Sequence, residues 1–343
     1  MKRIAAKLTG RRKFEFFEEE IPALGSHEIL LKTISVGLCH SDVPAYLGDG
    51  IFGINKHGYH YMEDKLPYPC RLGHEPVGQV IDVGKEVTAY HVGDYVTGCI
   101  DDAFCTHLIA DEHGLITKIP PTDKPVECCL GEPLMCVSNI VQAVAPVFGD
   151  RVAIIGSGFM GLMILCGVKG RNLKELTAVD LKDERLALAQ KYGATSVINP
   201  AKTDAEETMW ELTRGRGFDQ VVEITGSLKG LGTAASLVRI AKIGEAFGQG
   251  KIVAPSVYAK PEVWDPKLGY NLMFRSPIIH IVHPWYNADY RDTLGKAVDA
   301  YVNGIYPAEE LISHRFPFEN IETAFDHLTD NPEGYTKGIV TFD

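Results

Sequence analysis

The sequence predicts a two-domain α/β protein, in which a Gly-rich and mostly β domain is joined to a doubly wound parallel β-sheet. The chain has 343 residues, enough for about two domains of roughly 150 residues each. Its first part reads as short strands interrupted by Gly and Pro, whereas strand-like and helix-like stretches alternate from Arg151 onward. Such alternation is typical of parallel βαβ units.

Residues 1–133 are expected to be mostly β. Lys32–Val36 alternates polar and apolar side chains, as a half-buried strand does. The same pattern continues in PVGQVIDVGKEV and GDYVTGC.

The parallel sheet is expected over the middle of the chain. The apolar strand RVAIIGSG enters a Gly turn and is followed by a helix over 159–169. The stretch KDERLALAQKYG predicts a helix with Gly193 as its C-terminal cap. Further strands are expected in LTAVD, SVIN, FDQVVEITG and KIGEAFGQG, and further helices in AEETMWELTRG and LKGLGTAASLVRI. After residue 282, two helices and the strand GIVTFD could pack back onto the first domain.

Composition and charge exclude several classes of partner. The 34 basic and 45 acidic residues give a net charge of −11, and no basic run exceeds Arg11–Lys13. We therefore expect neither nucleic acid nor an anionic membrane as a partner. The longest apolar run, Val152–Val168, is interrupted by Gly and slightly short for a membrane span. Eight Cys without a recognisable secretory signal make a disulfide framework unexpected and favour a reducing cytoplasm.

A dinucleotide site is predicted at Gly156–Gly161 (GSGFMG), which fits G-x-G-x-x-G between a strand and a helix. Gly156 permits the tight turn, Gly158 lets the backbone approach a pyrophosphate, and Gly161 allows close helix packing. Phe159 and Met160 then begin the helix whose N-terminus meets the phosphates.

The next strand supplies the expected acid. Asp180 follows the motif by about 20 residues and can accept the ribose hydroxyls of the adenosine. Because its carboxylate would repel a 2′-phosphate, we favour NAD over NADP. Lys182 and Arg185 are nearby cations that could weaken this preference, and Arg185 and Thr225 are also assigned to the cofactor site. The alternative is a Gly-rich turn without a ligand, in which Asp180 caps a helix.

Residues with metal-binding chemistry concentrate in the first domain. The stretch GLCHSD contains Cys39, LGHEPVGQV contains His74, and GEPLM contains Glu132. A thiolate, an imidazole and a carboxylate are the kind of three-ligand set that a catalytic zinc uses. Their separation is far wider than that of zinc-finger ligands, so spacing alone does not establish a site. Alternatively, His40 and Asp42 cap a helix that starts near Asp42.

These motifs in this order resemble the zinc-dependent medium-chain alcohol dehydrogenases. The matching pieces run along nearly the whole chain: GLCHSD, GHEPVGQVIDVG, GDYV, EPL, GSGFMG, VDLKDER, KYGA and KGIVTF. The resemblance implies a GroES-like catalytic domain made of residues 1–133 and 283–343, and a Rossmann domain over 134–282. It also implies a homodimer or homotetramer.

The resemblance implies one catalytic zinc, held by Cys39, His74 and Glu132. Glu75 matches the acid beside the zinc, which binds it directly or through water in relatives. The Glu at position 132 resembles the polyol and threonine dehydrogenase branch, since ordinary alcohol dehydrogenases carry Cys there.

The neighbouring positions carry supporting roles by the same resemblance. Asp42 matches the carboxylate that orients the ligand His, and Ser41 matches the hydroxyl that relays the substrate proton. His40 and Lys337 match positions near the cofactor pyrophosphate.

Three departures from the family pattern carry expectations. Cys99 and Cys105 are too few for the Cys₄ lobe of relatives, so no structural zinc is expected. Pro44 stands where relatives often place a relay His, so the relay ends at Ser41 and the cofactor ribose, or His57 or His60 completes it. The longer segment 50–69, rich in aromatics such as Tyr59 and Tyr61, is expected to shape the substrate site or to form a subunit contact.

The predicted activity is reversible, NAD-linked and zinc-dependent oxidation of a secondary alcohol or polyol to the ketone. Candidate substrates are sugar alcohols, sugars, cyclitols and hydroxy amino acids. The alternatives are a zinc-free NAD(P)H reductase of the same fold and a non-catalytic NAD-binding protein.

Overall fold

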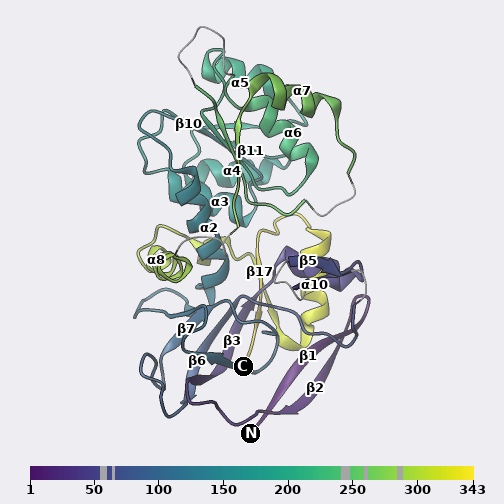
Figure 1. Ribbon diagram of the computed structural model, residues 1–343, viewed down its shortest axis with the longest axis vertical. Coiled ribbons are helices and arrows are strands. Elements are labelled where there is room, and N and C mark those ends of the chain that lie inside the picture. Colours follow the sequence, from purple (N-terminus) through teal and green to yellow (C-terminus); the bar gives the residue numbers. More distant parts are fainter. Residues whose placement is uncertain (55–59, 64–65, 241–247, 259–261, 284–288) are drawn as a thin grey trace. The chain divides into compact units, whose positions relative to one another are not determined.

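The computed structural model describes residues 1–54, 60–63, 66–240, 248–258, 262–283 and 289–343. It divides into two compact units, coloured by sequence in Figure 1. Unit 1 comprises Met1–Met135 and Arg291–Asp343, and unit 2 comprises Cys136–Tyr290. Parts of the predicted segment 50–69 and most of KIGEAFGQG lie outside the described residues, as do His57 and Tyr59.

Unit 1 is built on a sheet to which both ends of the chain contribute. Its strand order is β16-β17-β3-β6-β7-β9, and β8 also pairs with β3. The C-terminal strand β17 lies antiparallel to β3, with Val340 opposite Val36. The strands are β3 (Glu28–Gly37), β6 (Pro76–Val83), β7 (Tyr95–Gly98), β8 (His107–Asp111), β9 (Ile116–Lys118), β16 (His314–Pro317) and β17 (Gly338–Thr341).

The remaining elements of unit 1 cover or extend this sheet. Two antiparallel pairs are β1 (Lys2–Gly10) with β2 (Lys13–Glu20), and β4 (Ile51–Ile54) with β5 (His60–Glu63). The helices are η1 (His40–Asp42), α1 (Val43–Leu47), η2 (Val126–Cys128), α9 (Ala308–Leu311), η4 (Phe318–Asn320) and α10 (Ile321–Asp330). Two more helices, α2 (Gly131–Val144) and α8 (Tyr290–Val302), cross the boundaries between the units.

An aromatic cluster joins α1 and α10 inside unit 1. The Tyr46 and Phe14 rings lie 4.9 and 5.1 Å from the Phe325 ring, and Phe104 meets it edge-on at 5.5 Å. The Tyr46 hydroxyl donates to Asp326 Oδ1 at 2.9 Å, which satisfies the one polar atom of a fully buried side chain.

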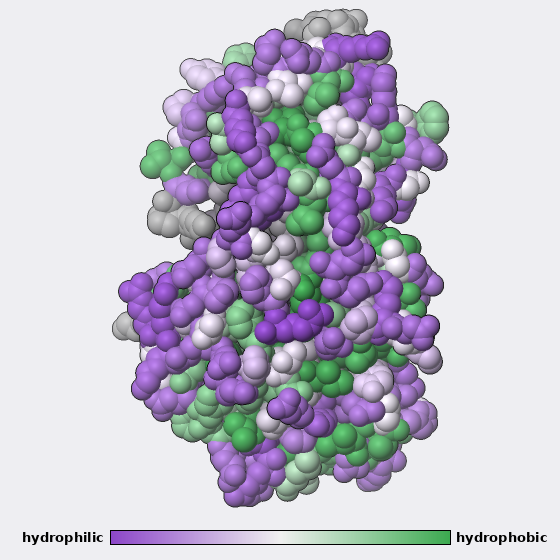
Figure 2. Space-filling model, turned by 180° about the vertical axis from the view of Figure 1, so that it is seen from behind, coloured by the Kyte–Doolittle hydropathy of each residue, from purple (hydrophilic) through white to green (hydrophobic). Residues whose placement is uncertain are grey.

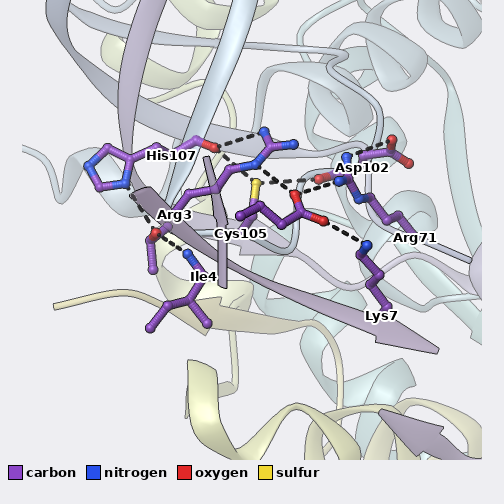
Figure 3. Close-up of polar contacts among 9 residues, drawn as sticks. Arg3, Ile4, Lys7, Arg71, Asp102, Cys105 and His107 are labelled. Atoms are coloured by element: carbon purple, nitrogen blue, oxygen red, sulfur yellow. Dashed lines mark hydrogen bonds and ion pairs between the residues drawn. The ribbon is translucent and has the colours of Figure 1, made fainter. Parts of the chain in front are cut away.

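An ion-pair network ties the β1–β2 hairpin to the rest of unit 1 (Figure 3). Glu19 is paired with Arg3 at 3.1 Å, Lys7 at 2.6 Å and Arg71 at 2.5 Å. Arg71 also approaches Asp102 at 3.5 Å. Although burial raises the pKa of Glu19, the three cations lower it to about 2. The carboxylate is therefore ionised at neutral pH and holds three separate segments together.

Unit 2 confirms the predicted doubly wound parallel sheet. Its strand order is β12-β11-β10-β13-β14-β15, and every neighbouring pair is parallel. The chain runs from β10 to one edge and then returns to build the other half, so the strand order reverses beside β10. Such a switch point is where open α/β sheets bind their ligands.

The elements of unit 2 agree with most of the predicted segments. The strands are β10 (Arg151–Ile155), β11 (Glu175–Val179), β12 (Ser196–Ile198), β13 (Gln220–Glu223), β14 (Lys251–Ala254) and β15 (Ile278–Ile281). The helices are α3 (Phe159–Val168), α4 (Asp183–Tyr192), α5 (Ala205–Thr213), α6 (Leu228–Leu237) and α7 (Pro266–Arg275). Gly193 caps α4 at φ 118°, as predicted.

The face seen in Figure 2 is largely hydrophilic, with apolar areas between the hydrophilic side chains. In the described part of the chain, none of the helices is long and apolar enough to cross a membrane.

Candidate active site and cofactor site

Pairing of β3 with β6 brings the Cys39 and His74 segments together. Val36 lies opposite Pro76, and the Gly37 N–H donates to the Glu75 carbonyl at 3.0 Å. A side chain at Gly37 would meet Glu75 Oε2 at 1.9 Å, so only glycine leaves room for the Glu75 carboxylate. The chain leaves the sheet after β3 and enters η1, which carries the Cys39 segment. The His74 segment is the loop that leads into β6.

Three potential metal ligands converge there. The donor atoms of Cys39, His74 and Glu75 all lie within 4.8 Å of one another. Ser41 Oγ donates to Cys39 Sγ at 3.2 Å and lies 3.4 Å from His74 Nε2. A thiol, an imidazole and a carboxylate from three positions match the donor chemistry of a catalytic zinc site.

Asp42 lies behind the His74 ring. Its Oδ1 is 3.6 Å from His74 Nδ1, so Nε2 is the nitrogen directed towards Cys39 and Ser41. Although burial lowers the pKa of His74, the charges of Asp42 and Cys39 raise it well above its usual value. Asp42 precedes α1, but its side chain makes no capping hydrogen bond. The helix-cap alternative for Asp42 is therefore wrong, and the carboxylate faces the imidazole as a ligand-orienting group would.

Lys337 pairs with Glu75 inside unit 1. Its Nζ lies 2.6 Å from Glu75 Oε2 and donates to the Leu38 carbonyl at 2.8 Å. Burial lowers the pKa of Lys337, whereas Glu75 and Cys39 raise it, so the net shift is upward. The side chain of Lys337 is nearly buried, and its charge compensates that of a fully buried carboxylate. Sequence reasoning did not anticipate this pair, whose members are far apart in the chain.

Glu132 lies near this cluster but outside it. It occupies the first turn of α2, where the Gly131 N–H donates to Thr97 Oγ1 at 2.8 Å. Burial, followed by the charge of Glu132, raises the pKa of Cys99. The structure thus brings together Cys39, His74 and Glu75 and places Glu132 close by. His40 is exposed on η1.

The Gly-rich turn of unit 2 follows β10. Gly156 has φ +100°, which an L side chain rarely adopts, and a side chain at Gly161 would come within 1.8 Å of the Gly156 carbonyl oxygen. Both glycines are therefore required by the turn. Gly158 is the N-cap of α3, with Phe159 and Met160 as the first helical residues. This helix N-terminus is suited to an anion such as a pyrophosphate.

Asp180 directly follows β11 and contacts this turn. Its two carboxylate oxygens accept the Ser157 N–H at 2.7 Å and the Lys182 N–H at 2.9 Å. Asp180 therefore anchors the turn in addition to any part it has in ribose binding. Arg185 lies close in sequence, half-buried on α4.

Thr225 lies beyond the end of β13 and is held by a buried acid. Its N–H donates to Glu223 Oε1 at 2.8 Å, and its hydroxyl donates to the same oxygen. The other oxygen of Glu223 accepts the Tyr258 hydroxyl at 2.5 Å. Glu223 thus fixes Thr225 and is itself held by Tyr258; sequence reasoning missed both residues, because neither belongs to the Gly-rich motif.

A β domain with a converging Cys–His–Glu set, together with a Rossmann-type sheet, defines a metal-binding dehydrogenase. Residues 25–119 match the alcohol dehydrogenase GroES-like domain, and residues 160–253 match the zinc-binding dehydrogenase domain. The chain belongs to the zinc-dependent medium-chain alcohol dehydrogenase family, and it is an oxidoreductase of that class.

Named relatives span nearly the whole chain. The chain is 25% identical to an erythritol/L-threitol dehydrogenase of Mycolicibacterium smegmatis, covering 96% of this chain and 95% of that protein. It is 28% identical to an L-threonine 3-dehydrogenase of Bacillus velezensis, covering 90% of each. The fold is shared with a protein of Sinorhizobium meliloti 1021 described as a zinc-binding dehydrogenase bound to NADP, at a TM-score of 0.79, 21% identity and 99% coverage of both chains.

Proposed function

We propose that the protein catalyses reversible, NAD-linked and zinc-dependent oxidation of a secondary alcohol or polyol to the ketone. The observation that carries the proposal is the convergence of Cys39, His74 and Glu75 within 4.8 Å. When bound, zinc supplies a Lewis acid for the alcohol oxygen, and the nicotinamide accepts the hydride.

The residues around the cluster support this chemistry. Asp42 holds His74 Nδ1, and the Ser41 hydroxyl, already hydrogen-bonded to Cys39 Sγ, passes on the proton of the substrate hydroxyl. We assign the third ligand position to Glu75 on the distances within the cluster, with Glu132 as the carboxylate that can replace it. The ammonium group of Lys337 then compensates the negative charge of the Glu75 carboxylate.

For the cofactor we propose NAD. Asp180 places a negative charge at the turn, which disfavours a 2′-phosphate. The protein of Sinorhizobium meliloti 1021 described as bound to NADP makes this choice worth testing directly. We propose one zinc at the catalytic site of each chain and no Cys₄ zinc, because the segment between Cys99 and Cys105 contains no other Cys.

The substrate class follows from the named relatives. Erythritol, threitol and threonine each present a secondary hydroxyl beside another polar group. We propose sugar alcohols, sugars, cyclitols and hydroxy amino acids as the substrates to test. All eight cysteines are free thiols in the structure, which supports a reducing, cytoplasmic setting.

We also propose that the protein is a homodimer or a larger homo-oligomer. Strand β15 is an edge of the unit 2 sheet, and its Ile278, Ile279 and Ile281 side chains are 53%, 42% and 65% exposed. An apolar edge strand of this kind is a template for pairing with another chain.

The experiment that tests the activity follows nicotinamide absorbance at neutral to alkaline pH. The protein is supplied with NAD and a panel of polyols, sugars, cyclitols, threonine and simple alcohols, with and without a chelator. We expect turnover on one substrate class, and we expect the chelator to abolish this turnover.

Cys39→Ala should abolish turnover while leaving NAD binding intact. Cys70→Ala, which changes another half-buried thiol of unit 1, should retain activity. Full activity of Cys39→Ala would refute the zinc mechanism.

A further inference from the structure

Three loops of unit 1 bring two histidines and two acids to one place. His27 directly precedes β3, Glu86 follows β6, and Glu112 and His113 follow β8. Pairing of β3 with β8 places Glu28 opposite Asp111, and the Glu112 N–H donates to the His27 carbonyl at 2.9 Å. We refer to His27, Glu86, Glu112 and His113 as the loop cluster.

Three side chains of the loop cluster bring their donor atoms close to one another. Glu112 Oε1 lies 2.8 Å from His27 Nδ1 and 3.9 Å from His113 Nε2. One donor atom from each of the three lies within 4.8 Å of the other two. Tetrahedral zinc bonds of about 2.0–2.2 Å place neighbouring donor atoms about 3.3–3.6 Å apart. This separation lies between the distances of Glu112 Oε1 from His27 Nδ1 and from His113 Nε2.

Backbone hydrogen bonds hold the Glu112 side chain in place. Its side chain is 3% exposed, and Oε2 accepts the backbone N–H groups of Thr88 at 3.0 Å and Ala89 at 3.2 Å. These bonds use the oxygen that faces away from the histidines and leave Oε1 directed at both rings. The His27 contact and these backbone groups together hold the carboxyl group in one orientation.

The second ring nitrogen of His27 also faces a carboxylate, that of Glu86. Glu86 Oε2 lies 3.2 Å from His27 Nε2, the nitrogen on the far side of the ring from Glu112. Imidazole ligands characteristically donate their other N–H to a carboxylate, which fixes the ring and raises its basicity. The cations at the cluster are Lys85, 3.6 Å from Glu86, and Arg291, which donates to the backbone oxygen of His113.

We propose that His27, Glu112 and His113 form a second metal site, separate from the Cys39 cluster, for a divalent transition ion such as Zn²⁺, Cu²⁺ or Ni²⁺. Two imidazoles and one carboxylate suit these ions and not Mg²⁺ or Ca²⁺, which take oxygen ligands. The ion joins the loops before β3 and after β8, and through Glu86 and the Thr88–Ala89 backbone it also engages the loop after β6. Binding to the folded state alone therefore stabilises this end of the β domain.

The test uses the full chain after chelation and dialysis, with zinc titrated calorimetrically into the Cys39→Ala background. We expect one equivalent of zinc to bind, and we expect His113→Ala or His27→Ala in that background to weaken its affinity at least tenfold. The matched control is His91→Ala, an exposed imidazole beside a single acid, Asp94, at 3.8 Å; it should leave binding unchanged. Absence of zinc binding to Cys39→Ala, or equal affinity in all three His variants, would overturn the proposal.

Unfolding temperatures, measured with EDTA and with zinc, distinguish loss of the metal site from poor folding of a variant. With EDTA present, His113→Ala should unfold at the same temperature as the parent. Zinc should raise the unfolding temperature of the Cys39→Ala parent and leave that of the His113→Ala double variant unchanged; an equal rise in both would count against the site. Because dehydrogenase turnover does not enter either readout, this proposal stands or falls separately from the proposed activity.

Discussion

We propose two tasks for the carboxylate of Asp180. It accepts two backbone N–H groups that shape the Gly-rich turn, and we propose that its charge also lies beside the adenosine ribose of the cofactor. The first task needs hydrogen-bond acceptors, and the second needs a negative charge. A substitution that keeps an acceptor and removes the charge separates the two.

We predict that Asp180→Asn shifts cofactor preference towards NADP. The amide oxygen preserves one acceptor, while loss of the charge removes repulsion of the 2′-phosphate. The ratio of kcat/KM for NADP to kcat/KM for NAD should rise at least tenfold, which corresponds to about 1.4 kcal/mol. Asp183→Asn on α4 is the control, because that carboxylate pairs with Lys202 and Asn199 instead. An unchanged ratio in Asp180→Asn would show that the charge does not select the cofactor.

At the same scale, the sequence identified residue types better than residue partners. Cys39 and His74 stand out as potential ligands in the sequence, but their meeting depends on the register that sets Val36 opposite Pro76. The Lys337–Glu75 pair joins the two ends of unit 1, and no local pattern announces it. His27 and Glu112 escaped notice for the same reason, since each is an ordinary loop residue until β3 and β8 pair.

Among the elements, the β1–β2 hairpin is held by electrostatics as well as by its apolar face, which buries Ala6, Leu8 and Phe14. Glu19 lies on β2, its side chain is 18% exposed, and it meets cations from β1 and from Arg71. Its neighbour Glu18 also meets a lysine, Lys2, but that pair is more than half exposed. The two glutamates therefore offer a matched comparison between a partly buried network and a surface ion pair.

We predict that Glu19→Gln lowers the free energy of unfolding by about 1–3 kcal/mol at pH 7, because three cations lose their shared partner. Glu18→Gln should change it by less than about 0.5 kcal/mol, as surface ion pairs contribute little. Since the pKa of Glu19 falls from 4.5 to about 2 on folding, its ionisation stabilises the fold above pH 4.5. This contribution disappears as the pH falls from 4.5 towards 2.

Urea unfolding of both variants and the parent at pH 7 and pH 3 measures this effect. The difference between parent and Glu19→Gln should shrink at pH 3, whereas Glu18→Gln should follow the parent at both values. A loss of stability in Glu19→Gln that is the same at both pH values would point to lost packing instead of lost charge.

The elements that sequence periodicity predicted are those with a clear local pattern. Helix α4 carries its own start and stop signals, and β10 is a short, fully buried apolar run. Helix α7 and strands β14 and β15 were not predicted, and the strand expected in KIGEAFGQG precedes β14 instead of covering it. Strand β15 is four residues long with every side chain exposed, so it lacks the alternation that marks a half-buried strand. Its strand geometry comes from pairing with β14, which is tertiary information.

For the whole molecule, the exposure of β15 has a consequence for assembly. Ile278 and Val282 donate their N–H groups to Gly250 and Ala254 on the β14 side. The intervening N–H groups of Ile279 and Ile281 therefore face the free edge of the sheet. A second copy of the chain can meet both these backbone groups and the isoleucine side chains, so the same strand offers directional bonds and apolar area.

We predict that the protein in solution has at least twice the chain mass of 37.7 kDa, measured by light scattering during gel filtration. Ile279→Pro removes an outward N–H without removing a bond to β14, and it should yield monomers that still bind NAD. Ile279→Lys should also yield monomers, because two lysines would repel each other across the paired edges.

The control is Ile305→Lys, which changes a 50% exposed isoleucine of unit 1 and should leave the mass unaltered. A monomeric parent would refute self-association, while an oligomer that survives both Ile279 substitutions would place the contact on another face. Retained NAD binding in the monomeric variants separates loss of assembly from loss of the sheet, since two strands, β13 and β14, lie between β10 with its Gly-rich turn and this edge.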